Sequence, residues 1–233
     1  MRRRPVAVVL SCEHGGHRVP AEHRSLFVGA GAVLRSHRGW DRGALVLARA
    51  FGRSLQVPLF EATVTRLLVD LNRSETNRAV FSSFTSGLPV DERQALLAEH
   101  HRPHRLAVRA AVAEQIALER CVLHVSVHSF TPVLDGRVRT TDVGLLYDPA
   151  RESERRHAAA WKTSLEARLP RLAIHCNAPY RGTSDGLTRW LRTQFSARDY
   201  AGLELELNQR FVEGGTWAKL RCVLVDSLEP VLA

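Results

Sequence analysis

The stretch Val6-Ala7-Val8-Val9-Leu10-Ser11-Cys12-Glu13-His14-Gly15-Gly16-His17 decides the fold of this chain. Its valine-rich first part, Val6–Leu10, predicts a buried β-strand. In open α/β sheets, ligands bind beyond the carboxyl ends of the strands, which is where the two histidines stand. The glycines between His14 and His17 permit a tight turn, so both imidazoles are able to face one point.

A second strand-like run, Cys121–Val127, ends directly before His128. Two strand ends that offer three imidazoles predict a metal site formed by His14, His17 and His128. Zinc is the expected ion, with its fourth coordination position left open. The alternative for each histidine is a simple hydrogen bond to a neighbouring loop, since histidine is common at partly buried positions.

Strands and helices alternate along the rest of the chain. This order predicts an α/β fold with three layers (α/β/α), in which helices cover both faces of a mostly parallel mixed sheet. Neither an internal repeat nor a linker is evident, so residues 1–233 are expected to form a single domain. Strands are expected at Val6–Leu10, Val57–Thr65, Leu67–Val69, Cys121–Val127, Val143–Tyr147, Leu172–Cys176 and Leu203–Leu207, and helices at Asp41–Phe51, Asp91–Leu118 (kinked or split at Pro103), Glu152–Leu169, Leu187–Phe195 and Thr216–Leu228.

Composition limits the class of protein. The 233 residues are 45% hydrophobic, which is enough for a sizeable core. The four cysteines lie far apart and form no CxxC pair, as expected in a reducing compartment. No apolar run approaches the roughly 20 residues of a membrane helix. The basic start, Met1–Pro5, precedes only five apolar residues, which is too short for a signal peptide. We therefore expect a cytoplasmic protein without a membrane partner.

The net charge of +9 comes almost entirely from arginine, because Lys162 and Lys219 are the only lysines. Such a surplus raises the alternative of an arginine-rich, nucleic-acid-associated binding protein. The even spread of arginine and the scarcity of aromatic residues disfavour it, so no nucleic-acid partner is expected. Some arginines are instead candidates for binding an anionic small substrate, because guanidinium grips carboxylate in a bidentate fork. These candidates are Arg66, Arg73, Arg139 and Arg181.

Four motifs stand in a defined order: Ser-Cys-Glu-His-Gly-Gly at 11–16, Val-Asp-Leu-Asn-Arg at 69–73, Ser-Val-His-Ser-Phe at 126–130 and Leu-Glu-Leu-Glu-Leu-Asn-Gln at 203–209. Together they resemble the N-formylglutamate amidohydrolase family. Trp40-Asp41, residues 144–147 and residues 179–186 are similar to further blocks of that family. The resemblance extends over about residues 6 to 225.

The resemblance implies a fold like that of the zinc exopeptidases (the phosphorylase/hydrolase-like fold), because the family is distantly similar to zinc carboxypeptidases and aspartoacylases. It implies zinc-dependent hydrolysis of N-formyl-L-glutamate to L-glutamate and formate. Carried over by motif, His14 and His128 bind the metal, Glu206 activates water, and Asn72 with Arg73 holds a substrate carboxylate. His17 stands where those enzymes carry a metal-binding glutamate, and Glu13 is the alternative third ligand.

Glu206 also has a case of its own. In the alternating run Leu203–Leu207, Glu204 and Glu206 share one strand face, which suits a general base beside a metal. The alternative is an edge strand with a solvent-facing polar side. On the long helix, His100, His101 and His104 offer another metal-ligand pattern, because His100 and His104 are four residues apart, but a solvated helix bend around Pro103 is expected there.

Two further interpretations stay open beside the leading one. The same machinery would serve a related deacylase or a carboxypeptidase-like hydrolase acting on another N-acyl amino acid or peptide. The nucleic-acid-binding protein described above is the third. The expected partner is a small anionic N-acyl amino acid, and the expected assembly is a monomer or a small homo-oligomer.

Overall fold

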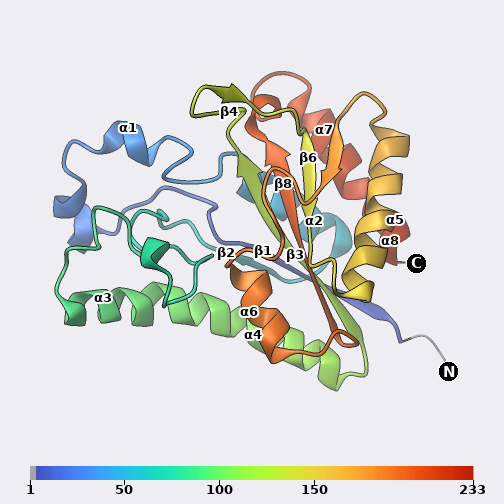
Figure 1. Ribbon diagram of the computed structural model, residues 1–233, viewed down its shortest axis with the longest axis horizontal. Coiled ribbons are helices and arrows are strands. Elements are labelled where there is room, and N and C mark those ends of the chain that lie inside the picture. Colours follow the sequence, from blue (N-terminus) through green and yellow to red (C-terminus); the bar gives the residue numbers. More distant parts are fainter. Residues whose placement is uncertain (1–3, 233) are drawn as a thin grey trace.

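The computed structural model describes residues 4–232, so the first three residues of the basic start lie outside the described part of the chain. Six strands form one sheet in the order β2-β1-β3-β8-β6-β7 (Figure 1). Strands β2, β1, β3 and β8 are parallel, whereas β6 pairs antiparallel with β8 and parallel with β7. The expected mostly parallel mixed sheet is therefore confirmed. The strands are β1 Val6–Cys12, β2 Leu59–Glu61, β3 Cys121–Phe130, β6 Val143–Leu146, β7 Ile174–Cys176 and β8 Tyr200–Asn208, and a separate hairpin joins β4 Val133–Leu134 to β5 Arg137–Val138.

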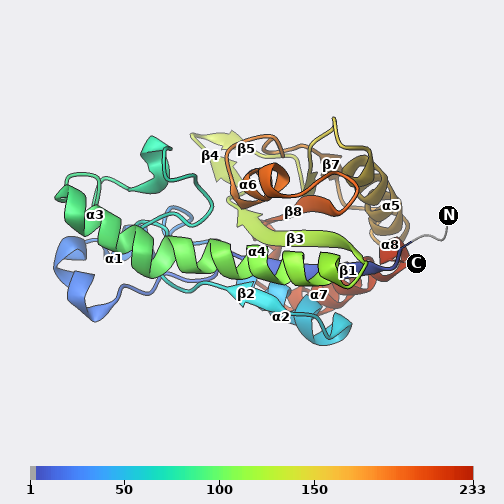
Figure 2. The same ribbon diagram turned by 90° about the horizontal axis from the view of Figure 1, so that it is seen from below.

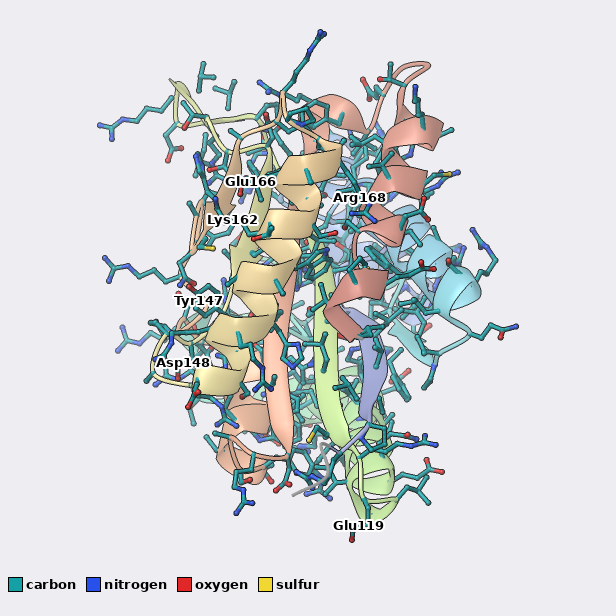
Figure 3. All side chains as sticks on the ribbon, turned by 90° about the vertical axis from the view of Figure 1, so that its right-hand side faces the viewer. Glu119, Tyr147, Asp148, Lys162, Glu166 and Arg168 are labelled. Carbon is teal, nitrogen blue, oxygen red and sulfur yellow. The ribbon has the colours of Figure 1, made fainter. Side chains whose placement is uncertain are left out.

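Helices cover both faces of the sheet, as expected. Helices α2, α5 and α7 cover one face, and α4 and α6 cover the other (Figure 2). On the outer side of α5, Lys162 and Glu166 form an ion pair one helical turn apart (Figure 3). The helices are α1 Gly31–Leu34, α2 Ala44–Leu55, α3 Val90–Leu96, α4 Arg102–Ala117, α5 Glu152–Arg168, α6 Leu187–Gln194, α7 Trp217–Asp226 and α8 Glu229–Leu232, with 3-10 turns η1 Ala21–Phe27, η2 Arg78–Val80 and η4 Gln209–Phe211 and a π turn η3 Leu97–His101.

The two faces of the central strands differ in chemistry. Alternate residues such as Leu123, Val125 and Leu205 enter the main hydrophobic core, where Trp161 and Phe51 also pack. The residues between them point to the other face, because successive side chains of a strand alternate. That face carries His124, Ser126 and His128 on β3, and Glu204 and Glu206 on β8, all of them buried. Strand β8 is thus an internal strand with a buried polar face, and not an edge strand with a solvated one.

One segment differs from expectation, and the expected split of the long helix near Pro103 is confirmed. Leu67–Val69 is not a strand: its residues fill a smaller core with Phe27 and Leu96, and the Leu68 carbonyl accepts a hydrogen bond from Thr85 Oγ1 at 2.9 Å instead of a strand partner. The long helix is split ahead of Pro103 by the π turn η3. Because proline lacks an N–H group, the regular helical hydrogen-bond pattern fails there, and a π turn absorbs the change in register.

None of the described helices combines the length and the apolar character that crossing a membrane requires.

Candidate active site

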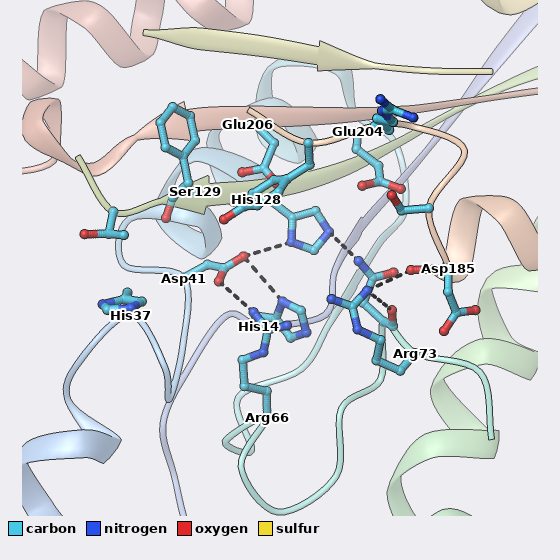
Figure 4. A pocket seen from close by; sticks show the side chains of 16 residues that line it. His14, His37, Asp41, Arg66, Arg73, His128, Ser129, Asp185, Glu204 and Glu206 are labelled. Carbon is cyan, nitrogen blue, oxygen red and sulfur yellow. Dashed lines mark hydrogen bonds and ion pairs between the residues drawn. The ribbon is translucent and has the colours of Figure 1, made fainter. Parts of the chain in front are cut away.

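A pocket of about 200 Å³ opens at the carboxyl ends of β1, β3 and β8 (Figure 4). His14 follows β1 by two residues, and His128 and Glu206 lie close to the ends of β3 and β8. Parallel strands end at the same edge of a sheet, and for this reason residues far apart in sequence meet here. The pairing of β3 with β8 sets His128 directly beside Glu206.

His14, Asp41 and His128 form a buried cluster at the bottom of this pocket. One ligand-type atom from each lies within 4.8 Å of the others. The Asp41 Oδ2 atom is 2.8 Å from His128 Nδ1 and 3.4 Å from His14 Nδ1. Asp41 reaches this position because its backbone N–H donates to the His14 carbonyl at 2.9 Å, just ahead of α2. Two imidazoles and a carboxylate are a donor set typical of zinc sites.

The far nitrogen of each imidazole contacts a second carboxylate. His14 Nε2 lies 2.7 Å from Asp70 Oδ1, and His128 Nε2 lies 3.0 Å from Glu13 Oε2. Such outer carboxylates fix the tautomer of a metal-binding histidine and leave its other nitrogen free to ligate. Both Nδ1 atoms therefore face the Asp41 carboxylate at the centre of the cluster.

The electrostatics of the cluster favour positive charge at its centre. Burial opposes the ionisation of Asp41, but His14 and His128 outweigh it and hold the pKa of Asp41 below its ordinary value. Burial likewise opposes protonation of His128, yet its hydrogen bonds to Asp41 and Glu13 raise the pKa of this imidazole well above its usual range. The residues present thus fit a divalent cation, which would take the place of a proton.

Glu206 is a buried carboxyl without a hydrogen bond at one of its oxygens. Its Oε2 atom has no partner among the described residues. Burial raises the pKa of Glu206 to about 8, and the nearby His128 charge only partly opposes this. No side chain intrudes from β6, because Gly144 stands opposite, where a Cβ atom would come within 2.2 Å of the Ala178 carbonyl oxygen. Glu206 is therefore a buried carboxyl that is able to exchange a proton near neutral pH.

His17 does not join the cluster, and the expected three-histidine site is corrected accordingly. A side chain at Gly16 would come within 2.6 Å of the Thr63 carbonyl oxygen, so the chain passes tightly there and then turns outward. The exposed His17 ring packs on Trp40, with ring centroids 5.0 Å apart. The third donor atom at the cluster belongs to Asp41, which the sequence analysis placed at the start of a helix and in a block similar to the family, but not at the metal.

Glu13, the alternative third ligand, is also outside the cluster. It lies behind His128, where its Oε2 atom accepts a hydrogen bond from Ser126 Oγ at 2.5 Å. Its Oε1 atom is 3.4 Å from Nε2 of His104, which is half-buried on α4. The expected solvated bend is therefore wrong for His104, and also for the buried His101, whose Nε2 contacts the Arg73 carbonyl oxygen at 2.8 Å. Their spacing gave no sign of these partners.

The arginines expected to bind substrate occupy different positions. Arg66 is engaged by carboxylates, at 2.7 Å from Asp70 Oδ2 and 3.6 Å from Asp41 Oδ1. Arg73 donates a hydrogen bond from Nη1 to the Asp185 carbonyl oxygen at 2.8 Å. Asp185 accepts no hydrogen bond from the other two guanidinium nitrogens of Arg73. Both arginines line the pocket.

Arg181 and Asn72 also line the pocket, whereas Arg139 does not. The Asn72 Oδ1 atom accepts from the Leu187 N–H at 2.7 Å, and its Nδ2 atom lies 3.4 Å from His128 Nε2. Arg139 donates to the hydroxyl of Tyr180 at 2.8 Å, and Tyr180 is the residue that reaches the pocket wall. Arg139 thus contacts a residue of the pocket wall but does not itself line the pocket.

The fold and this site define an α/β enzyme whose buried histidine–carboxylate cluster and proton acceptor meet at the carboxyl edge of the sheet. Comparison with known families makes the assignment specific. The N-formylglutamate amidohydrolase family model matches residues 6–212, and the chain belongs to this family of amide-hydrolysing enzymes.

Solved structures show the same fold. A gene product from Agrobacterium tumefaciens is 28% identical, with a TM-score of 0.83 over 97% of this chain and 90% of that chain. The N-formylglutamate amidohydrolase from Ralstonia eutropha is 18% identical and shares the fold, with a TM-score of 0.72 over 98% of this chain and 94% of that chain. No curated protein sequence matches the chain.

Proposed function

We propose that this amidohydrolase is zinc-dependent and hydrolyses N-formyl-L-glutamate to L-glutamate and formate. The observation that carries the proposal is the convergence of His14 Nδ1, His128 Nδ1 and the Asp41 carboxylate beside the unpartnered Oε2 of Glu206. These three residues would hold the ion. When bound, zinc supplies a Lewis acid for the amide carbonyl and lowers the pKa of water.

Glu206 is the proposed general base and acid. It would accept a proton from the water that attacks the carbonyl carbon, and the new C–O bond would form first. Glu206 would then deliver that proton to the amine nitrogen, and the amide C–N bond would break as the amine leaves. A pKa of about 8 suits this exchange, because a proton-transfer group works best when its affinity lies near the operating pH. Its burial also keeps competing solvent away from the carboxylate.

The pocket arginines support a substrate with two carboxylates. Arg66 is committed to Asp70 and Asp41, which leaves Arg73 and Arg181 facing the cavity. We propose that Arg73, steadied by Asn72, binds one substrate carboxylate and that Arg181 binds the second. Holding both ends would fix the scissile amide over the cluster, and such positioning contributes strongly to rate. Arg139 would act indirectly, by holding Tyr180.

The cysteines agree with the expected cytoplasmic location, because Cys12, Cys121, Cys176 and Cys222 all have free thiols.

The test uses chelator-treated protein reloaded with one equivalent of zinc and a panel of N-formyl, N-acetyl and longer N-acyl amino acids. We expect the highest kcat/KM for N-formyl-L-glutamate, and a tenfold or greater loss for N-formyl-L-glutamine, which lacks the second charge. His128→Ala should lose both zinc and activity. Glu206→Gln should keep the zinc and lose turnover about a hundredfold or more. Absence of hydrolysis across the panel by the zinc-loaded protein would overturn the proposal.

A further inference from the structure

A second group of metal-binding side chains lies outside the active-site pocket. It consists of His23 from η1 and of Glu99 and His100 from the π turn η3. One donor atom from each lies within 4.8 Å of the others. None of the three lines the pocket described above. Two segments separated by more than seventy residues of sequence are thus brought together by side chains with ligand chemistry.

His100 has a shielded nitrogen that is available to a ligand. Its Nε2 atom is shielded from solvent and has no hydrogen-bond partner among the described residues. Leaving such a polar atom unpaired is unfavourable, so a protein normally satisfies it.

The geometry needs little adjustment to hold an ion. Glu99 Oε1 lies 3.7 Å from His100 Nε2. Two ligand atoms at about 2.1 Å from a tetrahedral zinc ion are roughly 3.4 Å apart. The Glu99 side chain is 57% exposed, so an ion has access from solvent and water is able to complete its coordination. Two imidazoles and one carboxylate select zinc-like ions over magnesium or calcium, which prefer all-oxygen sites.

The π turn beside Pro103 also determines where the cluster residues lie. Here it places His100 beside His23 while the next residue, His101, contacts the Arg73 carbonyl oxygen at 2.8 Å. An ion at the cluster would therefore fasten η1 to the same turn that supports the backbone of Arg73.

We propose that His23, Glu99 and His100 form a second, structural binding site for a zinc-class divalent ion. This site is independent of the proposed active-site zinc, because the two clusters share no residue. Binding would stabilise the packing of η1 against η3 by mass action, since the ion binds the folded chain and not the unfolded one.

The test is zinc stoichiometry of chelator-treated protein, measured by equilibrium dialysis. We expect two equivalents for the wild type, and one for each of His23→Gln, His100→Gln and His128→Ala. His175→Gln replaces an exposed histidine that belongs to neither cluster and should still bind two. If His23→Gln and His100→Gln bind as many equivalents as the wild type, the second site does not exist. If only the active-site proposal fails, the wild type binds one equivalent and His23→Gln binds none.

Thermal unfolding gives a readout that does not depend on activity. In the His128→Ala background, zinc at about one hundred times its Kd should raise Tm by roughly 5–10 °C, whereas magnesium should not. Adding His23→Gln to that background should abolish the shift. An unchanged shift in the double variant would contradict the assignment. If His128→Ala does not fold, the comparison of His23→Gln with the wild type by dialysis still decides the question.

Discussion

Replacing Glu206 by glutamine should stabilise the metal-free protein at alkaline pH while it removes catalysis. Glu206 is buried, and its Oε2 atom has no partner. Ionising this group inside the fold therefore places an unsatisfied negative charge out of reach of water, which is unfavourable. Glutamine keeps the size and shape of the side chain but cannot ionise. The substitution thus removes the charge and leaves the packing in place.

The sign and size of the effect come from the pKa of Glu206. Burial raises it from 4.5 to about 8, so the folded state holds the proton more tightly than the unfolded state. The stabilisation from this proton is fully present below pH 4.5 and is lost as pH rises through about 8. Each tenfold difference in proton affinity is worth about 1.4 kcal/mol, which makes the whole effect about 5 kcal/mol. About 3 kcal/mol of this falls between pH 5.5 and 8.5.

The assay is urea unfolding of chelator-treated wild type and Glu206→Gln at pH 5.5 and pH 8.5. The other titrating groups are common to both proteins, so the difference between their pH dependences isolates Glu206. We expect the free energy of unfolding of the wild type to fall by about 3 kcal/mol more than that of the variant. Parallel pH dependences would refute the reasoning, because they would mean that Glu206 ionises inside the fold as it does in water.

Three further predictions concern the site. Glu13→Gln should weaken zinc binding about 10–100-fold in a chelator competition assay, because His128 Nε2 loses its charged partner; unchanged affinity would exclude that role. His17→Ala should keep wild-type zinc content and kcat/KM within about twofold, since its ring packs on Trp40, and loss of zinc would restore His17 as a ligand. Arg73→Lys should raise KM about tenfold or more with a smaller change in kcat, because lysine cannot form the bidentate fork, and an unaltered KM would count against a carboxylate contact there.

Much of the fold follows from local sequence pattern. The valine-rich run at Val6 and the alternating run at Leu203 both formed strands, because burial of one or both faces is encoded in residue order. Leu67–Val69 has the pattern of a strand for the same reason, but its apolar side chains pack in the smaller core and not against the sheet. A short apolar run specifies burial, and it does not specify which partner provides the hydrogen bonds.

The sequence predicted only those site residues whose positions are determined by the ends of strands. His14 follows a strand of the parallel set, and His128 and Glu206 lie near the ends of two others, so their convergence was expected and is observed. Asp41 lies just ahead of α2, and its backbone N–H donates a hydrogen bond to the carbonyl of His14, 27 positions earlier in the chain. No periodic pattern in the sequence predicts such a contact. His17 was misplaced because glycine freedom permits an inward turn without requiring one.

The wall segment at 177–186 is attached to the rest of the molecule in a way that bears on how this enzyme could diversify. The Asn177 Oδ1 atom accepts hydrogen bonds from the N–H groups of Tyr147 and Gly182, at 3.1 and 2.9 Å, so one side chain clasps the segment at its base. Tyr180 and Arg181 project from it into the cavity, whereas the histidines and Glu206 belong to or follow the strands. Changes within these ten residues would therefore alter the wall that contacts the substrate. They would leave the histidines and Glu206, which belong to or follow the strands, in place.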